Sequence, residues 1–470
     1  MPLHRPQKLT CSKIHRWDMT TLPPDGLWQL ADASIASNLG DLTIERPWFS
    51  TQPIFCKKQG NALSLATSWE ALVKQGTNTP DLGYVKDYLR FQTPFTHRTL
   101  ARGIRLVKHG ERVCINRDTL TVEPLPFPVA SLPLSQIPQR LSEQLKNTQD
   151  ACFHLSSGLD SSLLVLLARR LEQTVHAVTL QTRGKGAAQE LDTVKRLVDE
   201  TKITLSIFDF TNIDIWKEGE RMMTTGLGYP VAHPSHLVRY LLDRTVVESG
   251  LSRRIVTGRG PDEVLGGYDV HSLAYTDASR HFARLTCMPE DRITALFTDD
   301  ESGNTALAHA DFFRNSTTLQ QRLDYDLGAI YEAWNILEAD FSKSLDIEYI
   351  SPFLAPDIMA AFYLLPDGEK VSEHAQKIFL RTAFADVYPS YILSNPKMGL
   401  TIDLRHYMLD QSAESIVKIM YDQSEFGKRF LNRTACMKLV DDTLTGRVNY
   451  GWQIWNLYLC GLACRKLQSI

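Results

Sequence analysis

Apolar and polar positions follow a strand-like period in the first quarter of the chain. The stretch "PIFCKKQGNALSLATS" gives two short runs around Gly60-Asn61, which predicts a tight hairpin, and "GERVCINRDTLTVEP" repeats the pattern around Arg117-Asp118. The proline-rich stretch "EPLPFPVASLPLS" then interrupts the pattern at residues 123–135. We therefore predict a β-rich domain over residues 1–130 and a second domain over residues 131–470.

A different rhythm follows this connector. The short buried runs "ACFHL", "VHAVTL", "ITLSIFDF" and "RIVTG" read as strands that alternate with helices. One of these helices is "SHLVRYLLDRTVVESG", with Ser235 as the expected N-cap and Gly250 past its end. The alternation predicts an α/β fold with a parallel sheet covered by helices, which binds ligands at the carboxyl ends of its strands. The last third reads as largely helical, and its stripe of Trp452, Trp455 and Tyr458 is expected in the core.

The composition narrows the class of protein. Of 470 residues, 43% are hydrophobic and 22% charged, and the net charge of -3 gives no reason to expect nucleic-acid binding. The longest apolar run, residues 163–168, is too short to cross a bilayer. The eight cysteines have no regular spacing, and Cys460 and Cys464 suit a buried helix face better than a zinc site. We expect a reduced, cytoplasmic enzyme without nucleic-acid or membrane partners.

The stretch "HLSSGLDSSLL" is the first candidate for chemistry. It reads as a strand over 151–155, a loop, and a helix from Ser161. The N–H groups at a helix N-terminus favour an anion, and Gly158 lets the backbone approach while Ser156, Ser161 and Ser162 add hydroxyl donors. Asp160 would repel a phosphate unless Mg2+ lay between them. The alternative is that these residues only cap the helix. The loop has no Walker lysine, so transfer of a γ-phosphoryl group is not the expected use.

A second stretch, "VTGRGPDEVLGGY" at residues 256–268, favours the chemical interpretation. It leaves another predicted strand, turns on Gly258 and Gly260, and presents Asp262. A second carboxylate at a second strand end is what one Mg2+ shared with a nucleotide requires. The two stretches together therefore predict a nucleotide and metal site.

Together they resemble the synthetase half of the asparagine synthetase family. The pyrophosphate loop of that family reads Ser-Gly-Gly-aliphatic-Asp-Ser-Ser, here Ser156 to Ser162 with Ser157 in place of a glycine. Its second signature, Ser-Gly-x-Gly-x-Asp-Glu-x-x-Gly-Gly-Tyr, matches Thr257 to Tyr268. The stretches "GYPVAHPSHL", "LEADFSKSLDIEYISPFLAPDIM" and "KIFLRTAFADVYPSYILSNPKMGL" resemble further family segments, so that the resemblance covers roughly residues 40–470.

The resemblance implies a fold and a reaction. The fold is an α/β ATP-pyrophosphatase domain behind a β-rich domain that resembles a degenerate glutaminase (Ntn-hydrolase) domain. The reaction uses ATP and Mg2+: a carboxylate attacks the α-phosphate, which gives an acyl-adenylate and pyrophosphate. The residues expected to bind the nucleotide are Ser156, Ser157, Gly158, Asp160, Ser161, Ser162, Gly258 and Gly260, and Asp160 and Asp262 are the expected metal ligands.

Two further residues take catalytic roles by this resemblance. Glu348, at the family's Glu position before Ser351-Pro352-Phe353, would orient or deprotonate the attacking amine, unless it is a surface or capping carboxylate. Lys397, in "NPKMGL", would neutralise charge that grows on the α-phosphate and acyl oxygens, unless it is solvated. Lys377 and Arg381, one helical turn apart, reach phosphate or lie on a surface face. Arg259 meets a peptide carboxylate or the nucleotide, or faces solvent.

The start of the chain bears on the source of the amine. Glutamine-dependent members begin with a Cys exposed by removal of Met1, whereas Pro2 follows Met1 here and Cys11 is internal. A domain without the nucleophile is expected to be a scaffold, with an amine other than glutamine-derived ammonia. Relatives of this kind are β-lactam synthetases, carbapenam synthetases and lasso peptide cyclases, in which an amine of the same molecule attacks.

Arg259 lies between the two glycines of the second motif and counts against two branches of the family. The β-lactam synthetases have a Tyr at this position, and the asparagine synthetases have a Glu. The shortened front domain fits a lasso peptide cyclase best, which joins the N-terminal amine of a precursor peptide to an Asp or Glu side chain. The alternatives are a β-lactam-type synthetase, an ammonia-using asparagine synthetase, and a non-catalytic scaffold. The expected partners are the precursor peptide and, as candidates, the leader-peptide protease and leader-binding protein of the same pathway.

Overall fold

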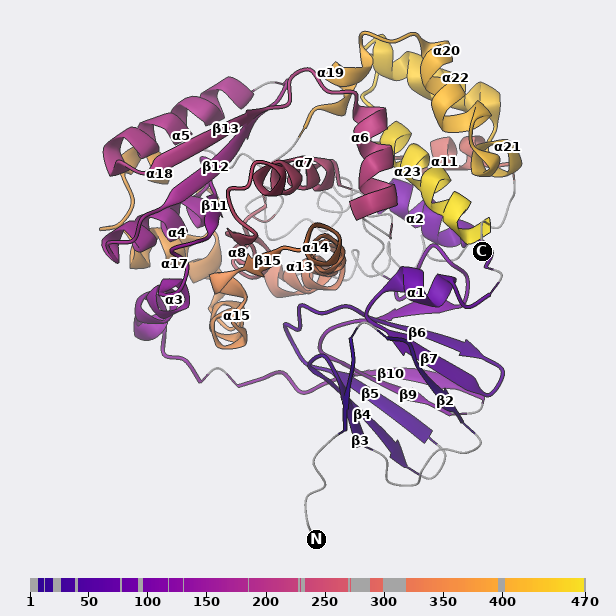
Figure 1. Ribbon diagram of the computed structural model, residues 1–470, viewed down its shortest axis with the longest axis horizontal. Helices are drawn as coiled ribbons and strands as arrows, with labels where there is room; N and C mark the ends of the chain where they lie inside the picture. Colours follow the sequence, from indigo (N-terminus) through magenta and orange to yellow (C-terminus); the bar gives the residue numbers. More distant parts are fainter. Residues whose placement is uncertain are drawn as a thin grey trace.

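The computed structural model places an N-terminal β-sandwich beside a parallel sheet covered by helices (Figure 1). The described residues are 7–11, 13–19, 27–38, 41–76, 78–91, 96–116, 118–129, 131–184, 186–226, 229, 233–268, 271, 288–298, 318–395 and 402–468. Within them no helix is long and apolar enough to cross a membrane.

Two mainly antiparallel sheets form the sandwich. The larger has the order β1 (Gln7–Leu9), β3 (Leu27–Leu30), β4 (Ala33–Asn38), β5 (Asp41–Arg46), β9 (Glu111–Ile115) and β10 (Leu120–Pro124). The smaller has the order β2 (His15–Asp18), β7 (Ala62–Ala66), β6 (Ile54–Gln59) and β8 (Ile104–Val107). Leu42 and Ile44 alternate with polar residues along β5 and are fully buried between the sheets. Both predicted hairpins are confirmed: β6 pairs with β7 across Gly60-Asn61, and β9 pairs with β10.

The helix α1 (Trp69–Val73) lies against β6, β7 and β8, whereas α2 (Leu82–Phe91) packs against the C-terminal helices. Tyr84 and Tyr88 of α2 share one hydrophobic cluster with Trp455 and Leu459 of the last helix, α23 (Gly451–Gln468). The first part of the chain therefore shares a core with the C-terminal helices.

The parallel sheet decides where the candidate loops lie. Its order is β13 (Thr204–Asp209), β12 (His176–Gln181), β11 (Cys152–His154), β14 (Arg254–Val256) and β15 (Glu348–Ile350), and every neighbouring pair is parallel. The chain moves from β11 outward to β13 and then returns to the other side of β11 with β14. The carboxyl ends of β11 and β14 therefore flank a topological switch point, where such sheets bind ligands.

Both faces of this sheet are covered. On one face Phe153 packs with α3 (Ile137–Leu145) and α4 (Leu159–Arg170), and on the other its neighbour Cys152 packs with Leu242 and Val246 of α7 (Ser235–Glu248). Adjacent residues of a strand point to opposite faces, which explains why all of "ACFHL" is apolar except His154. The predicted α/β fold with a parallel sheet is thus confirmed.

Two predicted helix starts are wrong by one or two residues. The helix α4 begins at Leu159 rather than Ser161, with Gly158 as its N-cap, and the N-cap of α7 is Pro234 rather than Ser235. Gly250 does follow the end of α7 in a left-handed conformation, with φ of 68°. The shift in α4 places Asp160 in the first helical turn, where its carboxylate projects from the helix surface.

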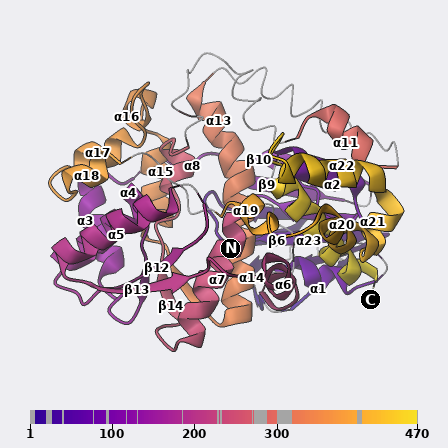
Figure 2. The same cartoon turned by 90° about the horizontal axis from the view of Figure 1, so that it is seen from above.

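The remaining helices surround the sheet and form a C-terminal bundle (Figure 2). Around the sheet and along the centre lie η1 (Leu134–Gln136), α5 (Ala187–Thr201), α6 (Ile215–Arg221), η2 (Met222–Gly226), α8 (Pro261–Val264), α13 (Leu319–Asp326), η3 (Leu327–Tyr331), α14 (Glu332–Leu345), η4 (Pro352–Leu354), α15 (Pro356–Tyr363), α16 (Asp367–Lys370), α17 (Ile378–Ala383) and α18 (Ser390–Leu393). The bundle contains α11 (Glu290–Leu296), α19 (Leu404–Met408), α20 (Ala413–Val417), η5 (Lys418–Asp422), α21 (Glu425–Phe430), α22 (Arg433–Leu444) and α23. Trp455, Tyr458, Cys460 and Cys464 of α23 are buried, as expected, whereas Trp452 is only partly buried against the same cluster.

Candidate active site where two loops meet

The first loop, residues 155–158, joins β11 to α4 and closes on itself through its serines. The Oγ of Ser161 accepts a hydrogen bond from the N–H of Ser156 at 3.1 Å and lies 2.9 Å from the Oγ of Ser156. The Oγ of Ser162 donates to the carbonyl of Ser156 at 3.4 Å. No side chain caps α4, whose N-cap is Gly158. Ser161 and Ser162 therefore shape the loop, and Asp160 is not used as a helix cap.

Ser157 contributes a buried hydroxyl and a backbone N–H to the first loop. Its side chain is buried, and its Oγ has no hydrogen-bond partner among the described residues. Its backbone N–H donates to the carboxylate of Glu190, in the first turn of α5, whose pKa is raised to about 7 by burial. The backbone N–H of this loop is therefore placed to donate to an oxygen acceptor.

The second loop, residues 257–260, lies directly against the first. A Cβ atom on Gly258 would lie 2.8 Å from the backbone nitrogen of Ser161, so only glycine permits this approach. Gly260 has φ of 118°, and a Cβ there would lie 2.7 Å from Leu354. The Oγ1 of Thr257 lies 2.9 Å from the Oγ of Ser351, which ties the loop to the end of β15. Gly258 thus brings the second loop against the start of α4, and Gly260 brings it against Leu354.

Lys377 lies between the two aspartates that these stretches supply. Its Nζ forms ion pairs with Asp160 and with Oδ1 of Asp262, the latter at 2.6 Å, and its side chain is 3% exposed. Burial would lower the pKa of Lys377, but the two carboxylates outweigh it and raise the pKa above its usual value. The structure therefore brings Asp160 and Asp262 together on the ammonium of Lys377, and their role as Mg2+ ligands stays a prediction.

Lys377 is the functional residue that the sequence analysis left open. It has φ of 53° and directly precedes α17, so the left-handed turn aims its side chain back at the loops. Gly267 gives it space, because a Cβ there would lie 1.8 Å from Oδ1 of Asp262 and 2.4 Å from Cε of Lys377. The signal was present in the Lys-x-x-Leu-Arg segment, but only the fold shows which partners it reaches.

A buried acidic side chain lies in α8, the short helix that follows the second loop. Glu263, next to Asp262 in α8, accepts a hydrogen bond from the Oη of Tyr268 at 2.8 Å. Burial first, and then the charge of Asp262, raise the pKa of Glu263 to about 7. The two acids of α8 thus have different surroundings, and Asp262 is the one that lies with Lys377.

These residues suit Mg2+ shared with a nucleotide better than a metal held by protein alone. The described residues contain no group of three or more His, Cys, Asp or Glu side chains arranged to hold a metal ion. Mg2+ commonly takes one or two carboxylates together with phosphate oxygens and water. Asp160 and Asp262, which both pair with Lys377, would supply the carboxylates of that donor set.

Glu348 does not lie with these residues, so its predicted catalytic place is wrong. It is the first residue of β15, its side chain is 61% exposed, and its Oε2 pairs with the Nε of Arg254 at 2.9 Å. Because β15 is parallel to β14, its first residue lies at the edge of the sheet opposite to the two loops.

Lys397 lies outside the described residues, but the chain on either side of its segment is placed. Before it, the Nδ2 of Asn395 donates to the carbonyl of Ser157 in the first loop at 3.2 Å. After it, the Oη of Tyr407 in α19 accepts from the N–H of Arg183, which follows β12, and donates to the carbonyl of Phe210, which follows β13, both at 2.9 Å. Both flanks therefore contact the carboxyl edge of the parallel sheet.

The side chain of Arg259 points neither to solvent nor into open space. It is 6% exposed and forms an ion pair with Oε2 of Glu338 at 2.5 Å. It also donates to the carbonyl of Tyr331 at 3.2 Å and to the side chain of Asn335. The sequence predicted that Arg259 contacts a peptide or nucleotide, or else faces solvent. In the structure its side chain instead binds residues of α14.

Comparison with known protein sequences matches this chain to asparagine synthetases. The family model described as asparagine synthase matches residues 136–467. The glutamine-hydrolyzing asparagine synthetase 1 of Bacillus subtilis (strain 168) is 20% identical over 478 residues, which cover 87% of this chain and 73% of the relative. Among solved structures, an NH3-dependent NAD synthetase from Campylobacter jejuni in complex with nitrate matches 45% of this chain and 96% of its own, with 16% identity and a TM-score of 0.21.

Proposed function

The chain belongs to the asparagine synthase family, and we propose that this ATP-dependent carbon–nitrogen ligase closes a macrolactam ring in a precursor peptide. An Asp or Glu side chain of the peptide attacks the α-phosphorus of ATP, which forms an acyl-adenylate and releases pyrophosphate. The N-terminal amine of the same peptide then attacks the acyl carbon, loses a proton and expels AMP. The peptide loses one water overall.

One observation carries the nucleotide part of this proposal: Asp160, Lys377 and Asp262 converge where the two loops touch at the switch point. Transfer at a phosphate depends on positioning and neutralised charge more than on covalent help from the protein. The first loop supplies N–H groups at the start of α4 and no Walker lysine. This arrangement supports release of pyrophosphate rather than transfer of the γ-phosphoryl group.

We assign the metal and the lysines separate roles within this proposal. Asp160 and Asp262 would hold Mg2+, which supplies neutralisation of the pyrophosphate charge when bound. Before the nucleotide arrives, Lys377 keeps the two carboxylates together by balancing their charge. Lys397 would neutralise charge on the α-phosphate and the acyl oxygen.

The choice of an amine within the substrate rests on two arguments. An intramolecular attack avoids the entropy of bringing two molecules together, and therefore does not require a supply of ammonia. Arg259, at the position where related branches have Glu or Tyr, pairs with Glu338 and distinguishes this chain from those branches. Because the amine must be a free N-terminus, a protease that exposes it and a protein that presents the precursor are proposed partners.

The test uses the full chain with ATP, Mg2+ and a peptide that has a free N-terminus and an Asp or Glu several residues on. We expect loss of one water from the peptide mass, resistance to aminopeptidase, and AMP and pyrophosphate in equal amounts. The matched controls are the N-acetylated peptide, which cannot close, and the peptide with Asn or Gln in place of the acid.

Other products would identify the alternatives. Stoichiometric ADP and phosphate would overturn adenylation altogether. AMP formed with free aspartate and ammonia, but not with peptides, would identify an ammonia-using asparagine synthetase. Closure of a small β-amino acid would identify a β-lactam-type synthetase, and the absence of ATP turnover with every substrate class would favour a scaffold.

A further inference from the structure

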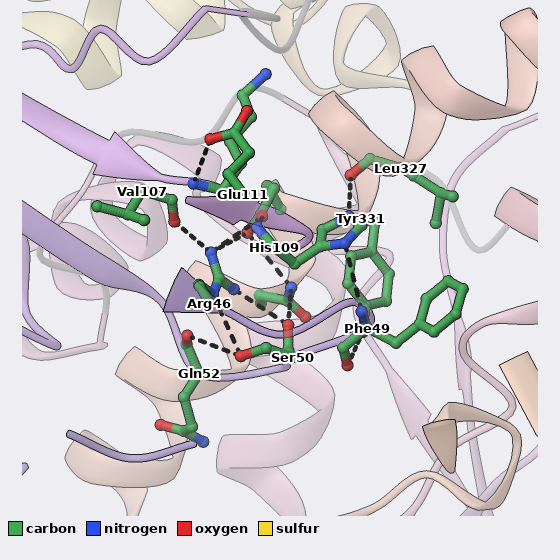
Figure 3. A network of polar contacts seen from close by, with 12 residues as sticks. Arg46, Phe49, Ser50, Gln52, Val107, His109, Glu111, Leu327 and Tyr331 are labelled. Carbon is green, nitrogen blue, oxygen red and sulfur yellow. Dashed lines mark hydrogen bonds and ion pairs between the residues drawn. The ribbon is translucent and has the colours of Figure 1, made fainter. Parts of the chain in front are cut away.

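A buried ion pair joins the N-terminal sandwich to the centre of the ligase half. The guanidinium of Arg46, the last residue of β5, lies 3.0 Å from both carboxylate oxygens of Glu332 at the start of α14, and both side chains are almost fully buried. Arg46 also donates to the carbonyl of Val107 at 2.7 Å and to the carbonyl of Ser50 at 3.1 Å (Figure 3). This arginine therefore holds β5, β8 and α14 together.

The same face of α14 leads from this pair to the second loop. Asn335, one turn after Glu332, donates through Nδ2 to the carbonyl of Ser50 at 3.2 Å and to Oε2 of Glu332 at 3.4 Å. Its Oδ1 accepts a hydrogen bond from Arg259. The next turn supplies Glu338, the ion-pair partner of Arg259. The path from Arg46 to the second loop is thus continuous and spans two turns of one helix.

A further set of contacts runs from Glu338 to the strand before the first loop. Oε1 of Glu338 lies 3.2 Å from Arg239 of α7, which pairs with Asp243 at 2.8 Å. Oδ1 of Asp243 lies 2.8 Å from Nε2 of His154, the last residue of β11. Both loops therefore connect, through buried side chains, to the same helix α14.

The charges along this path balance. Three arginines alternate with three carboxylates: Arg46, Glu332, Arg259, Glu338, Arg239 and Asp243. Burial lowers the pKa of His154, which favours its neutral form. Because the network is buried, loss of one member leaves its partner uncompensated, and the remaining groups must shift or take up water. A substitution at Arg46 should therefore alter the charge balance and the hydrogen bonds around Arg259.

We propose that Arg259 is a positioning residue through which the N-terminal sandwich holds the second loop in its ligand-binding geometry. The sandwich acts through Arg46, Glu332 and Asn335, and the loop responds through Gly258, which lies against the backbone of the first turn of α4. The inference rests on the proposed function only in that these loops bind ATP. The N-terminal sandwich would then contribute to nucleotide binding without a catalytic nucleophile of its own.

The experiment measures the affinity of the full chain for ATP·Mg2+ by calorimetry, at a temperature where every variant is folded by circular dichroism. Arg46→Met, which changes a residue outside both loops, should weaken binding by roughly three- to tenfold, and Arg259→Met by roughly tenfold or more. The combined variant should bind no more weakly than Arg259→Met, because both changes break one path. Arg259→Lys keeps a positive charge opposite Glu338 but lacks the planar guanidinium with its several N–H donors. It should therefore recover part of the affinity that Arg259→Met loses.

The matched control is Arg90→Met, which removes an equally buried arginine from α2, where Arg90 pairs with Asp87 at 3.1 Å. It should lower stability and leave the affinity for ATP unchanged. Wild-type affinity in Arg46→Met and Arg259→Met, or a loss equal to that of Arg90→Met, would overturn the inference and leave the proposed function standing. Failure of the unaltered chain to bind ATP would overturn both.

Discussion

The Nζ of Lys377 lies 2.6 Å from Oδ1 of Asp262, and the same ammonium forms an ion pair with Asp160. The three residues come from distant parts of the chain and meet only because β11 and β14 are neighbours in the sheet. Two buried carboxylates repel each other unless a cation lies between them. The site therefore carries a built-in counter-ion at the position where the proposed metal and nucleotide bind.

Replacing this counter-ion should destabilise the chain in a way that Mg2+ reverses. Lys377→Met leaves two partly buried carboxylates uncompensated, which should lower the free energy of unfolding by about 3–5 kcal/mol. Added Mg2+ should restore much of that loss, because it binds between the same carboxylates. Thermal unfolding with and without Mg2+ measures both effects. The exposed Lys343 of α14 provides the control variant Lys343→Met, and an equal response to Mg2+ in both would contradict the prediction.

Lys397 and Asp262 should fail in different ways. Lys397→Ala should still bind ATP·Mg2+, while turnover falls by roughly a hundredfold or more, because the ammonium acts on charge that develops only in the transition state. Asp262→Ala should weaken metal-dependent nucleotide binding itself. Titration with a non-hydrolysable ATP analogue beside a turnover assay separates the two defects. Normal turnover in Lys397→Ala would return this lysine to a solvent-facing role.

The contact between the loops should depend on Gly258. Gly258→Ala places a Cβ 2.8 Å from the backbone nitrogen of Ser161, so the loops must separate. We expect a loss of about 1–3 kcal/mol of stability together with weaker ATP binding. Gly368→Ala is the matched control, because its Cβ would meet nothing within 4 Å. Calorimetry and denaturant unfolding of both variants provide the comparison, and an unchanged affinity in Gly258→Ala would show that the close approach is not needed.

Stability should fall as the pH drops because of His233. Its Nδ1 accepts from the N–H of Ser235 at 3.2 Å at the start of α7, and its ring lies 4.9 Å from that of Trp452. Burial lowers the pKa of His233 to about 4. Between that value and the usual pKa of about 6.5 only the unfolded chain binds this proton, so stability is complete above the window and is lost as the pH falls through it.

The matched variant for this prediction is His233→Asn, which keeps an acceptor for the N–H of Ser235 but does not titrate. The free energy of unfolding of the unaltered chain should fall relative to that of the variant by about 1.4 kcal/mol for each pH unit inside the window. Denaturant unfolding between pH 4 and 7.5 measures the difference in free energy of unfolding between the two proteins, to which the other titrating groups contribute equally. If the two free energies change in parallel with pH, the prediction is wrong.

The sequence by itself determined what is local or periodic. Alternation predicted the hairpin at Gly60-Asn61, apolar runs predicted β11 to β14, and the two motifs predicted that Asp160 and Asp262 lie close together. These features depend on neighbouring residues or on the rule that carboxyl ends of parallel strands share one edge. The helix starts were less certain, because a cap depends on backbone angles that several residue types permit.

Only the tertiary structure decided which distant side chains meet. It assigned Lys377 to the two aspartates, moved Glu348 to the opposite edge of the sheet, and buried Arg259 against α14. A lysine, a glutamate and an arginine in a sequence each suit a surface or a site equally well, and their partners here come from other elements. Strand order and helix packing set those partners, and both arise from burial summed over the whole chain rather than from any one segment.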